Sequence, residues 1–188
     1  MMPPTQAPIE PAEARDYAEL TMMIDLAMAR SVRHHRQRLR CRPGCSGCCK
    51  SFSVLGVEAA AIERALARLA ADALALIRSR ADREEECPFL LDSLCAIYHH
   101  RPLICRSQGL AVAYIDHQRQ AIEVSACPLN FPDDFPFAEE DLFFMDPFNH
   151  KLVELNRDFC AKNGLRPEER VTFKKLAATP VAPDTKQP

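Results

Sequence analysis

The feature that most constrains this chain is a short stretch that contains four cysteines. It reads Cys41-Arg42-Pro43-Gly44-Cys45-Ser46-Gly47-Cys48-Cys49. Proline and glycine bend a backbone tightly, and glycine adopts conformations that are closed to other residues, so such a loop can turn several thiolates toward one point. Four more cysteines follow at Cys87, Cys95, Cys105 and Cys127. Eight cysteines, four of them in one loop, indicate a metal site.

Thiolate suits zinc, copper(I) and iron–sulfur clusters, and a structural zinc ion takes four ligands in a tetrahedron. Cys48 and Cys49 are neighbours, so their side chains tend to diverge, and one mononuclear ion would use both poorly. Two four-cysteine zinc sites or one multinuclear iron–sulfur cluster would use them better. The expected cofactor is therefore zinc or iron, with an iron–sulfur cluster left open. The expected metal ligands are Cys41, Cys45, Cys48, Cys49, Cys87, Cys95, Cys105 and Cys127.

The expected compartment favours metal over disulfides. The first residues, Met-Met-Pro-Pro-Thr-Gln-Ala-Pro, have no apolar segment of the signal-peptide type, and apolar runs such as Leu110 to Ile115 are too short to cross a bilayer. We therefore expect a cytoplasmic protein with reduced thiols. In an exported protein, disulfides would become the leading interpretation. The ninth cysteine, Cys160, lies in a helical pattern and is expected to be a free thiol that packs as a small hydrophobic side chain.

Composition limits the partners. The chain has 188 residues, 47% of them hydrophobic, which suits one domain with its own core. The net charge of −2 gives no global attraction to nucleic acid or anionic lipid. Metal ions are the expected partners, with a protein partner left open. The basic residues Arg30, Arg33, Arg36, Arg38 and Arg40 precede the cysteine loop. They could offset the charge of a thiolate site or simply form a solvated face, and no aromatic residues interleave with them as in a nucleic-acid surface.

Hydrophobic periodicity predicts an α+β fold that is mainly helical, with a small antiparallel hairpin and cysteine-rich loops packed against helices. Four helices are expected, at residues 11–39, 57–80, 147–162 and 167–177. A short helix is expected at 138–145, and one helical turn after Pro102. Two short strands are expected within 87–98 and a hairpin from 109–116 and 120–126. Asp146-Pro147 predicts a helix start, and Asn163-Gly164 a helix end.

The expected domain organisation is a mobile N-terminus at 1–10, a single domain at 11–177 with its cysteine core at 41–127, and a disordered tail at 178–188. In the two longest helices, Tyr17, Leu20, Ile24, Ala27 and Ser31 mark one buried stripe. The other predicted stripe consists of Ile62, Leu66, Leu69, Ala73 and Leu76.

The order of the cysteine motifs resembles the YkgJ-type family of cysteine-cluster proteins, which are described as zinc- or iron-chelating domains. The resemblance is carried by Cys41-x3-Cys45-x2-Cys48-Cys49, Cys87-Pro-Phe-Leu, Cys95-Ala-Ile-Tyr, Arg101-Pro-x2-Cys105-Arg106 and Cys127. It implies metal chelation by the eight cysteines. Some larger members look like flagellin lysine methylases, so an iron–sulfur redox or methyl-transfer enzyme is one alternative. A thiol-based redox sensor, which loses metal on oxidation, is another.

Catalytic signals are otherwise weak, since the sequence contains no P-loop, no HExxH and no nucleophile motif. We therefore favour a binding module over an enzyme. His99 and His100 are expected at the surface rather than as ligands, and His34 and His35 have still less support. Arg101 and Arg106 flank Cys105, where they could donate hydrogen bonds to sulfur or form surface ion pairs. Tyr98 is expected in the core. The acidic residues Asp133, Asp134, Glu139, Glu140 and Asp141 are expected on a solvated face.

Overall fold

The computed structural model describes residues 11–83 and 86–180. Within them the fold is α+β and mainly helical, with small sheets, as predicted. The predicted mobile N-terminus and all but the first three residues of the predicted disordered tail lie outside the described residues. Those three residues begin with Ala178, which is the last residue of a helix and not part of a disordered tail.

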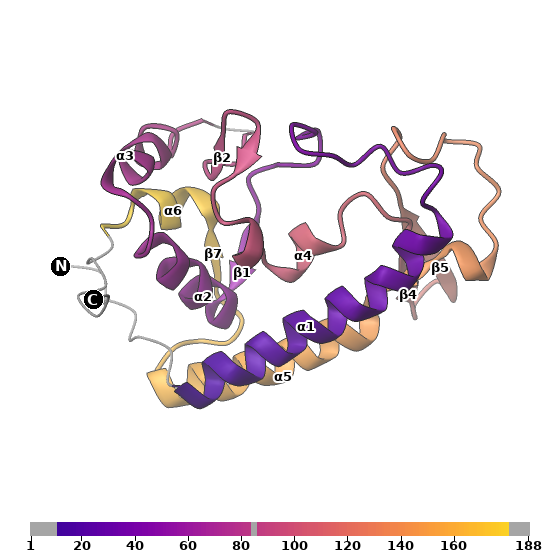
Figure 1. The fold of residues 1–188 in the computed structure, drawn as a ribbon. Helices are drawn as coiled ribbons and strands as arrows, with labels where there is room; N and C mark the ends of the chain where they lie inside the picture. Colours follow the sequence, from indigo (N-terminus) through magenta and orange to yellow (C-terminus); the bar gives the residue numbers. More distant parts are fainter. Residues whose placement is uncertain (1–10, 84–85, 181–188) are drawn as a thin grey trace.

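Two long helices lie side by side along one edge of the molecule (Figure 1). Helix α1 spans Pro11–His34 and buries Tyr17, Leu20 and Ile24, which confirms the predicted stripe. It ends five residues before the predicted boundary and continues into a turn, in which the carbonyl of His35 accepts hydrogen bonds from the backbone N–H groups of Arg38 and Leu39. Helix α5 spans Asp146–Asn163 and ends at Gly164, whose φ of 65° is the left-handed conformation that glycine adopts readily.

The predicted continuous helix at 57–80 is wrong. The chain forms α2 (Gly56–Leu66) and α3 (Ala71–Ser79), separated by a tight turn. No proline or glycine marks the break, and the alanine-rich sequence favours helix throughout. The break rotates the second half, so Ile77 is buried and the predicted Leu76 is 52% exposed. The turn lets α3 contact the C-terminal helix, which one continuous straight helix would not reach.

The strands of the described residues form three small sheets. Strand β4 (Val112–Asp116) pairs antiparallel with β5 (Ala121–Ser125), which confirms the predicted hairpin, and also pairs parallel with β6 (Phe143–Phe144). Strands β2 (Leu90–Leu91) and β3 (Leu94–Cys95) form the expected short pair.

The third sheet was not predicted. Strand β1 (Ser53–Leu55) pairs with β7 (Arg170–Thr172), which occupies the start of the predicted last helix. Helix α6 therefore begins later, at Phe173, and ends at Ala178. The predicted helix at 138–145 is also wrong, since only the 3-10 turn η2 (Glu139–Asp141) forms before β6. Two further elements are the 3-10 turn η1 (Tyr98–His100) and the helical turn α4 (Leu103–Arg106), the latter as predicted after Pro102.

Two hydrophobic clusters hold these elements. One joins α1, α5 and the β4 sheet through residues such as Leu20, Ile24 and Phe159. The other joins α2, α3 and α6 through Ile62, Ile77 and others, and it extends to the partly buried Cys49, Cys95 and Cys105. Helix α2 contributes to both clusters, so the cysteine region rests on a helix that is fixed from two sides. None of the described helices is long and apolar enough to cross a membrane.

Candidate metal centre

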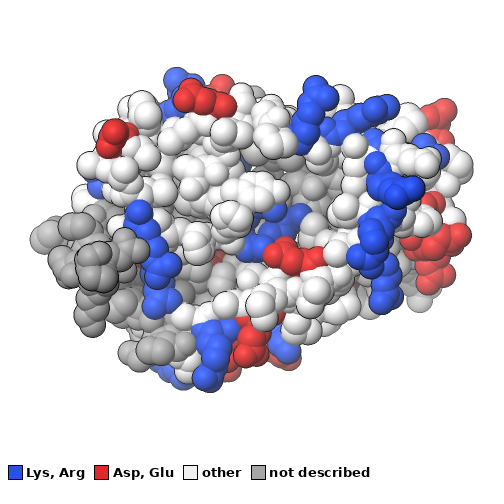
Figure 2. Space-filling model, viewed as in Figure 1, with Lys and Arg blue, Asp and Glu red and all other residues white. Residues whose placement is uncertain are grey.

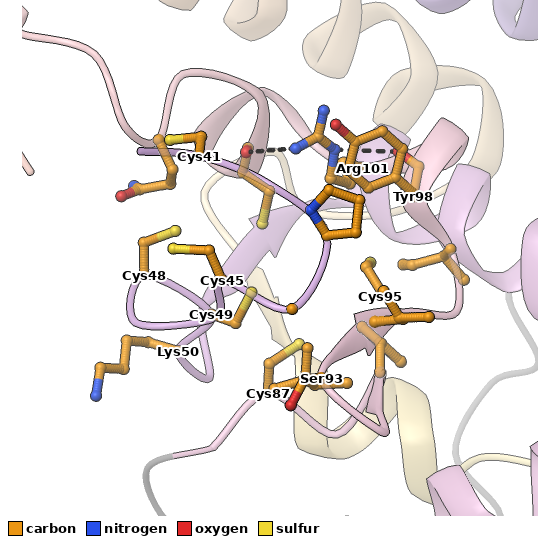
Figure 3. Close-up of a pocket in the computed structure, with 18 of the residues that line it drawn as sticks. Cys41, Cys45, Cys48, Cys49, Lys50, Cys87, Ser93, Cys95, Tyr98 and Arg101 are labelled. Carbon is orange, nitrogen blue, oxygen red and sulfur yellow. Dashed lines mark hydrogen bonds between the residues drawn. The ribbon is translucent and has the colours of Figure 1, made fainter. Parts of the chain in front are cut away.

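Cysteines from separate parts of the chain line one cavity of about 580 Å³. Figure 3 shows the cysteines of the 41–49 loop at one side of it, with Cys87 and Cys95 across from them. Cys105 also contributes to the wall. The cavity lining thus contains seven of the eight predicted ligands, namely Cys41, Cys45, Cys48, Cys49, Cys87, Cys95 and Cys105. Cys127 is not among the lining residues.

The 41–49 loop is shaped by successive turns. The backbone N–H of Cys45 donates to the carbonyl of Arg42 at 2.9 Å, and that of Cys49 donates to Ser46 at 2.9 Å. Gly44 has a φ of 89°, a conformation that residues with a side chain rarely adopt. Each turn therefore reverses the chain after two or three residues, which brings the cysteines of this loop to one wall of the cavity.

The opposite wall is built on the β2–β3 hairpin. Cys87 connects to the loop through its N–H, which donates to the carbonyl of Cys49 at 3.4 Å. Cys95 lies directly opposite Leu90 in the hairpin register. The turn between the strands places Asp92 and Ser93 at φ values of 46° and 62°, which Asp tolerates better than most residues. Cys87 and Cys95 are therefore held near each other by a short, locally determined element.

Cys105 is positioned by a buried glutamate that sequence reasoning missed. Glu58, on α2, is only 3% exposed. Its two carboxylate oxygens accept hydrogen bonds from the backbone N–H of Leu103, at 3.0 Å, and of Leu55, at 3.3 Å. Burial raises the pKa of Glu58, although these hydrogen bonds oppose the shift. Glu58 thereby fixes the start of α4, the turn that carries Cys105, to α2.

The two arginines next to Cys105 support the backbone. Buried Arg106 donates to the carbonyls of Arg101, at 2.7 Å, and His99, at 2.8 Å, and pairs with Asp25 of α1. Arg101 donates to the carbonyls of Tyr98 and Cys105, at 3.1 and 3.4 Å, and its guanidinium lies 3.8 Å from the centre of the Tyr98 ring. Neither expected role describes them fully, because both residues fold the segment that presents Cys105.

Cys41 is contacted by Asn130, which lies in the loop after the β4–β5 hairpin. The side-chain N–H of Asn130 approaches the Cys41 sulfur at 3.4 Å and donates to the carbonyl of Gly109 at 2.7 Å. The Asn130 oxygen accepts from the backbone N–H of Arg40 at 2.7 Å. The carbonyl of Cys127 accepts hydrogen bonds from the N–H groups of Asn130 and Phe131. Cys127 therefore lies one turn away from the residue that contacts Cys41, although it does not line the cavity.

Several cysteines change one another's pKa values. A hydrogen bond from Cys48 lowers the pKa of Cys49, while burial and the nearby Cys87, Cys95 and Cys105 oppose this shift. The same hydrogen bond, together with burial, raises the pKa of Cys48. Burial raises the pKa of Cys87 to about 11, and it also raises the pKa of Cys95 and of Cys105. Without metal, most of these thiols hold their protons at neutral pH, so a metal must displace protons to bind.

The sulfurs are spaced more widely than in a closed mononuclear site. A zinc ion with four thiolates at about 2.3 Å brings neighbouring sulfurs to about 3.8 Å. Among the residues that the structure describes, no three cysteine sulfurs lie within 4.8 Å of one another. The donor set fits zinc or iron in type and number, but four thiolates must draw inward to enclose a single ion.

Other predicted features can be placed as well. Tyr98, expected in the core, is 55% exposed, because its ring stacks on Arg101 at the wall of the cavity. His99 and His100 are exposed, as expected, although His99 lies at the cavity edge. Figure 2 shows Lys and Arg side chains gathered over the end of α1. All nine cysteines are free thiols, and Cys160 is buried against Asn156 of α5, as predicted.

Comparison with known families agrees with this arrangement. Residues 40–128 match the family described as "CxxCxxCC: Putative zinc- or iron-chelating domain". This confirms the resemblance to the YkgJ-type cysteine-cluster proteins, and the matched segment spans all eight predicted ligands. The match supports binding of zinc or iron. No curated protein and no solved structure matches the chain.

Proposed function

We propose that the protein is a metal-binding module that chelates zinc or iron through the cysteines around the cavity. The observation that carries this proposal is the convergence of three segments, the 41–49 loop, the β2–β3 hairpin and α4, on one thiol-lined space. Thiols that are merely buried for packing do not need to face a shared cavity. Thiolate donors in this number suit zinc and iron, and their chelation would add to folding stability by tying the loops together.

The ligands divide into two groups in this proposal. Cys49, Cys87, Cys95 and Cys105 form an inner group, since their charges act on one another's pKa values. Cys41, Cys45, Cys48 and Cys127 form an outer group, connected through Asn130 and the first turns of the loop. The vicinal Cys48 and Cys49 then serve different groups, and the hydrogen bond between their thiols, which the expected divergence of the two side chains did not foresee, places the two groups next to each other.

A multinuclear iron–sulfur centre is the second candidate, because the predicted cysteine ligands outnumber the four that one zinc ion takes. In a cluster each iron takes its own thiolate, so the sulfurs stand farther apart than around one ion. The absence of any sulfur trio within 4.8 Å among the described residues is consistent with such spacing. A cluster with one iron left open for a substrate would also support the redox or methyl-transfer alternative.

Elemental analysis and a visible spectrum of protein purified without oxygen test the proposal. A colourless protein with about two zinc ions per chain supports the two-group arrangement, and a brown protein with iron and sulfide supports the cluster. Protein that carries no metal, and whose thermal unfolding is unchanged by a chelator, contradicts both. A spectrum that changes on adding substrate, with turnover, would be needed for the enzyme alternative.

A pair of serine substitutions supplies the matched control. We expect Cys105→Ser to lose metal, because it removes an inner ligand and leaves the backbone intact. Cys160→Ser makes the same chemical change at a buried thiol that contacts Asn156, outside the cavity. It should therefore keep the full metal content. Equal metal content in the two variants would contradict the assignment of Cys105.

A further inference from the structure

A group of metal-binding side chains lies outside the cysteine cavity and outside the matched residues 40–128. His34 ends α1, His35 follows it, and Asp141 comes from η2, more than a hundred residues later. Their ligand atoms all lie within 4.8 Å of one another. From the sequence alone, His34 and His35 have little support as ligands, and Asp141 is expected on a solvated face. The fold brings the three together.

One carboxylate oxygen is the centre of this group. Nε2 of His34 lies 3.1 Å from Asp141 Oδ1, and Nε2 of His35 lies 3.9 Å from the same oxygen. Nitrogen and oxygen donors bound to zinc at about 2.0–2.2 Å in a tetrahedron stand about 3.3 Å apart. The two observed distances bracket this value, so a cation can be accommodated by small rotations of the side chains.

The group is held in place before any cation enters. The other carboxylate oxygen of Asp141 accepts the backbone N–H of Ala138 at 2.9 Å, which fixes its orientation. The His35 side chain is 2% exposed and packs edge-on against Phe131. The His34 side chain is 48% exposed. The group thus has a rigid inner side and one side open to solvent.

We propose that His34, His35 and Asp141 bind a divalent transition-metal cation of the zinc type, at a site separate from the thiol cavity. Two imidazoles and one carboxylate suit zinc and iron(II), and three protein ligands leave a coordination position for water or another ligand. Nε2 of His35 now lies 3.0 Å from the carbonyl oxygen of Asp141. A cation bound at Nε2 requires each imidazole to carry its proton on Nδ1, so the carbonyl of Asp141 would exchange its contact with His35 for the cation or for water.

The alternative is a purely structural role, in which the histidines hydrogen-bond to Asp141 and join α1 to η2. The two roles differ in what a metal does. A structural contact needs no cation and gives no saturable binding. A site binds one equivalent and loses affinity when a single ligand is removed.

Cobalt(II) provides a spectroscopic probe of the full-length protein with its cysteine sites left as purified. Equilibrium dialysis should show one further equivalent of cobalt, with weak visible bands and without the near-ultraviolet bands of cobalt–thiolate bonds. His34→Ala and Asp141→Asn should each weaken this binding at least about tenfold, the lower end of what loss of even an outer-shell partner costs. The melting temperature without cobalt reports whether the variants are folded.

The chain offers two controls. His117→Ala removes an exposed histidine in the turn between β4 and β5, and Glu140→Gln removes an exposed charge next to Asp141. Both should bind cobalt like the unmodified protein. No further equivalent, cobalt held only with thiolate bands, or unchanged binding in folded His34→Ala would each overturn the site. The zinc or iron content of the protein as purified is measured separately, so failure here leaves the thiol proposal intact.

Discussion

Gly109 provides the sharpest test of how the fold places a cysteine. Its φ is 96°, and a Cβ built on it would lie 2.6 Å from the Cys41 sulfur. Gly109→Ala therefore has two effects. The backbone conformation costs an L-residue about 1–2 kcal/mol. The contact is also too short, so the Cys41 side chain must turn away, and its sulfur then loses the approach of Asn130 at 3.4 Å.

Two other glycines separate these effects. Gly164 also has a positive φ, 65°, but nothing lies within 4 Å of its Cβ position. Gly164→Ala should therefore have a backbone cost of about 1–2 kcal/mol, which corresponds to a fall in melting temperature of about 2–8 °C in a domain of this size. Gly47 has open space around it as well and no positive φ, so Gly47→Ala should be close to neutral.

The assay combines unfolding in urea, with and without a chelator, and metal content by elemental analysis. We expect Gly109→Ala and Gly164→Ala to have similar stability when metal-free. Only Gly109→Ala should lose metal, because only it displaces a ligand. Gly109→Ala protein that retains the metal content and affinity of Gly164→Ala would refute the reasoning, since the Cys41 sulfur would then not depend on this approach.

Two further predictions follow from the site. Burial raises the pKa of Cys87 to about 11, so the folded, metal-free, reduced protein favours the neutral thiol. The contribution of Cys87 to the free energy of unfolding should be fully present below about pH 9 and should be lost as the pH rises through about 11. Urea unfolding between about pH 8 and 10.5 checks this, and a profile with no such loss would count against it. Arg106→Lys should cost about 2–4 kcal/mol, because lysine cannot reproduce the fork that serves two carbonyls and Asp25. Arg83→Lys, at an exposed pair with Glu86, should cost under about 0.5 kcal/mol in the same unfolding measurement.

Local patterns determined how much of the fold could be predicted. The start and end of α5 are marked by Pro147 and Gly164, and the stripe of α1 repeats over several turns, so both follow from nearby residues. The break after Leu66 and strand β7 have no such mark. The first depends on where α3 finds its packing partners, and the second is three residues long and exists only because β1 lies beside it.

The same distinction applies to the site. Clustered cysteines and their spacing identify the donor atoms, and the structure brings seven of the eight to one cavity. The residues that position them are ordinary in the sequence. Glu58 looks like one more solvent-facing helix residue, and Asn130 like part of a loop. Only their contacts with Leu103 and Cys41, far away along the chain, reveal what they do.

Residues outside the matched segment 40–128 stabilise the fold around the cysteines. Much of the cluster beneath β4 comes from outside residues 40–128, including Leu20 and Ile24 of α1 and Phe159 of α5. Arg106, next to Cys105, pairs with Asp25, and Cys41 is approached by Asn130, both outside the segment. The same outer parts bring His34 to Asp141. Helix α1 and the chain after residue 128 therefore hold the cysteine region in shape, and they also supply the three side chains of the proposed second metal site.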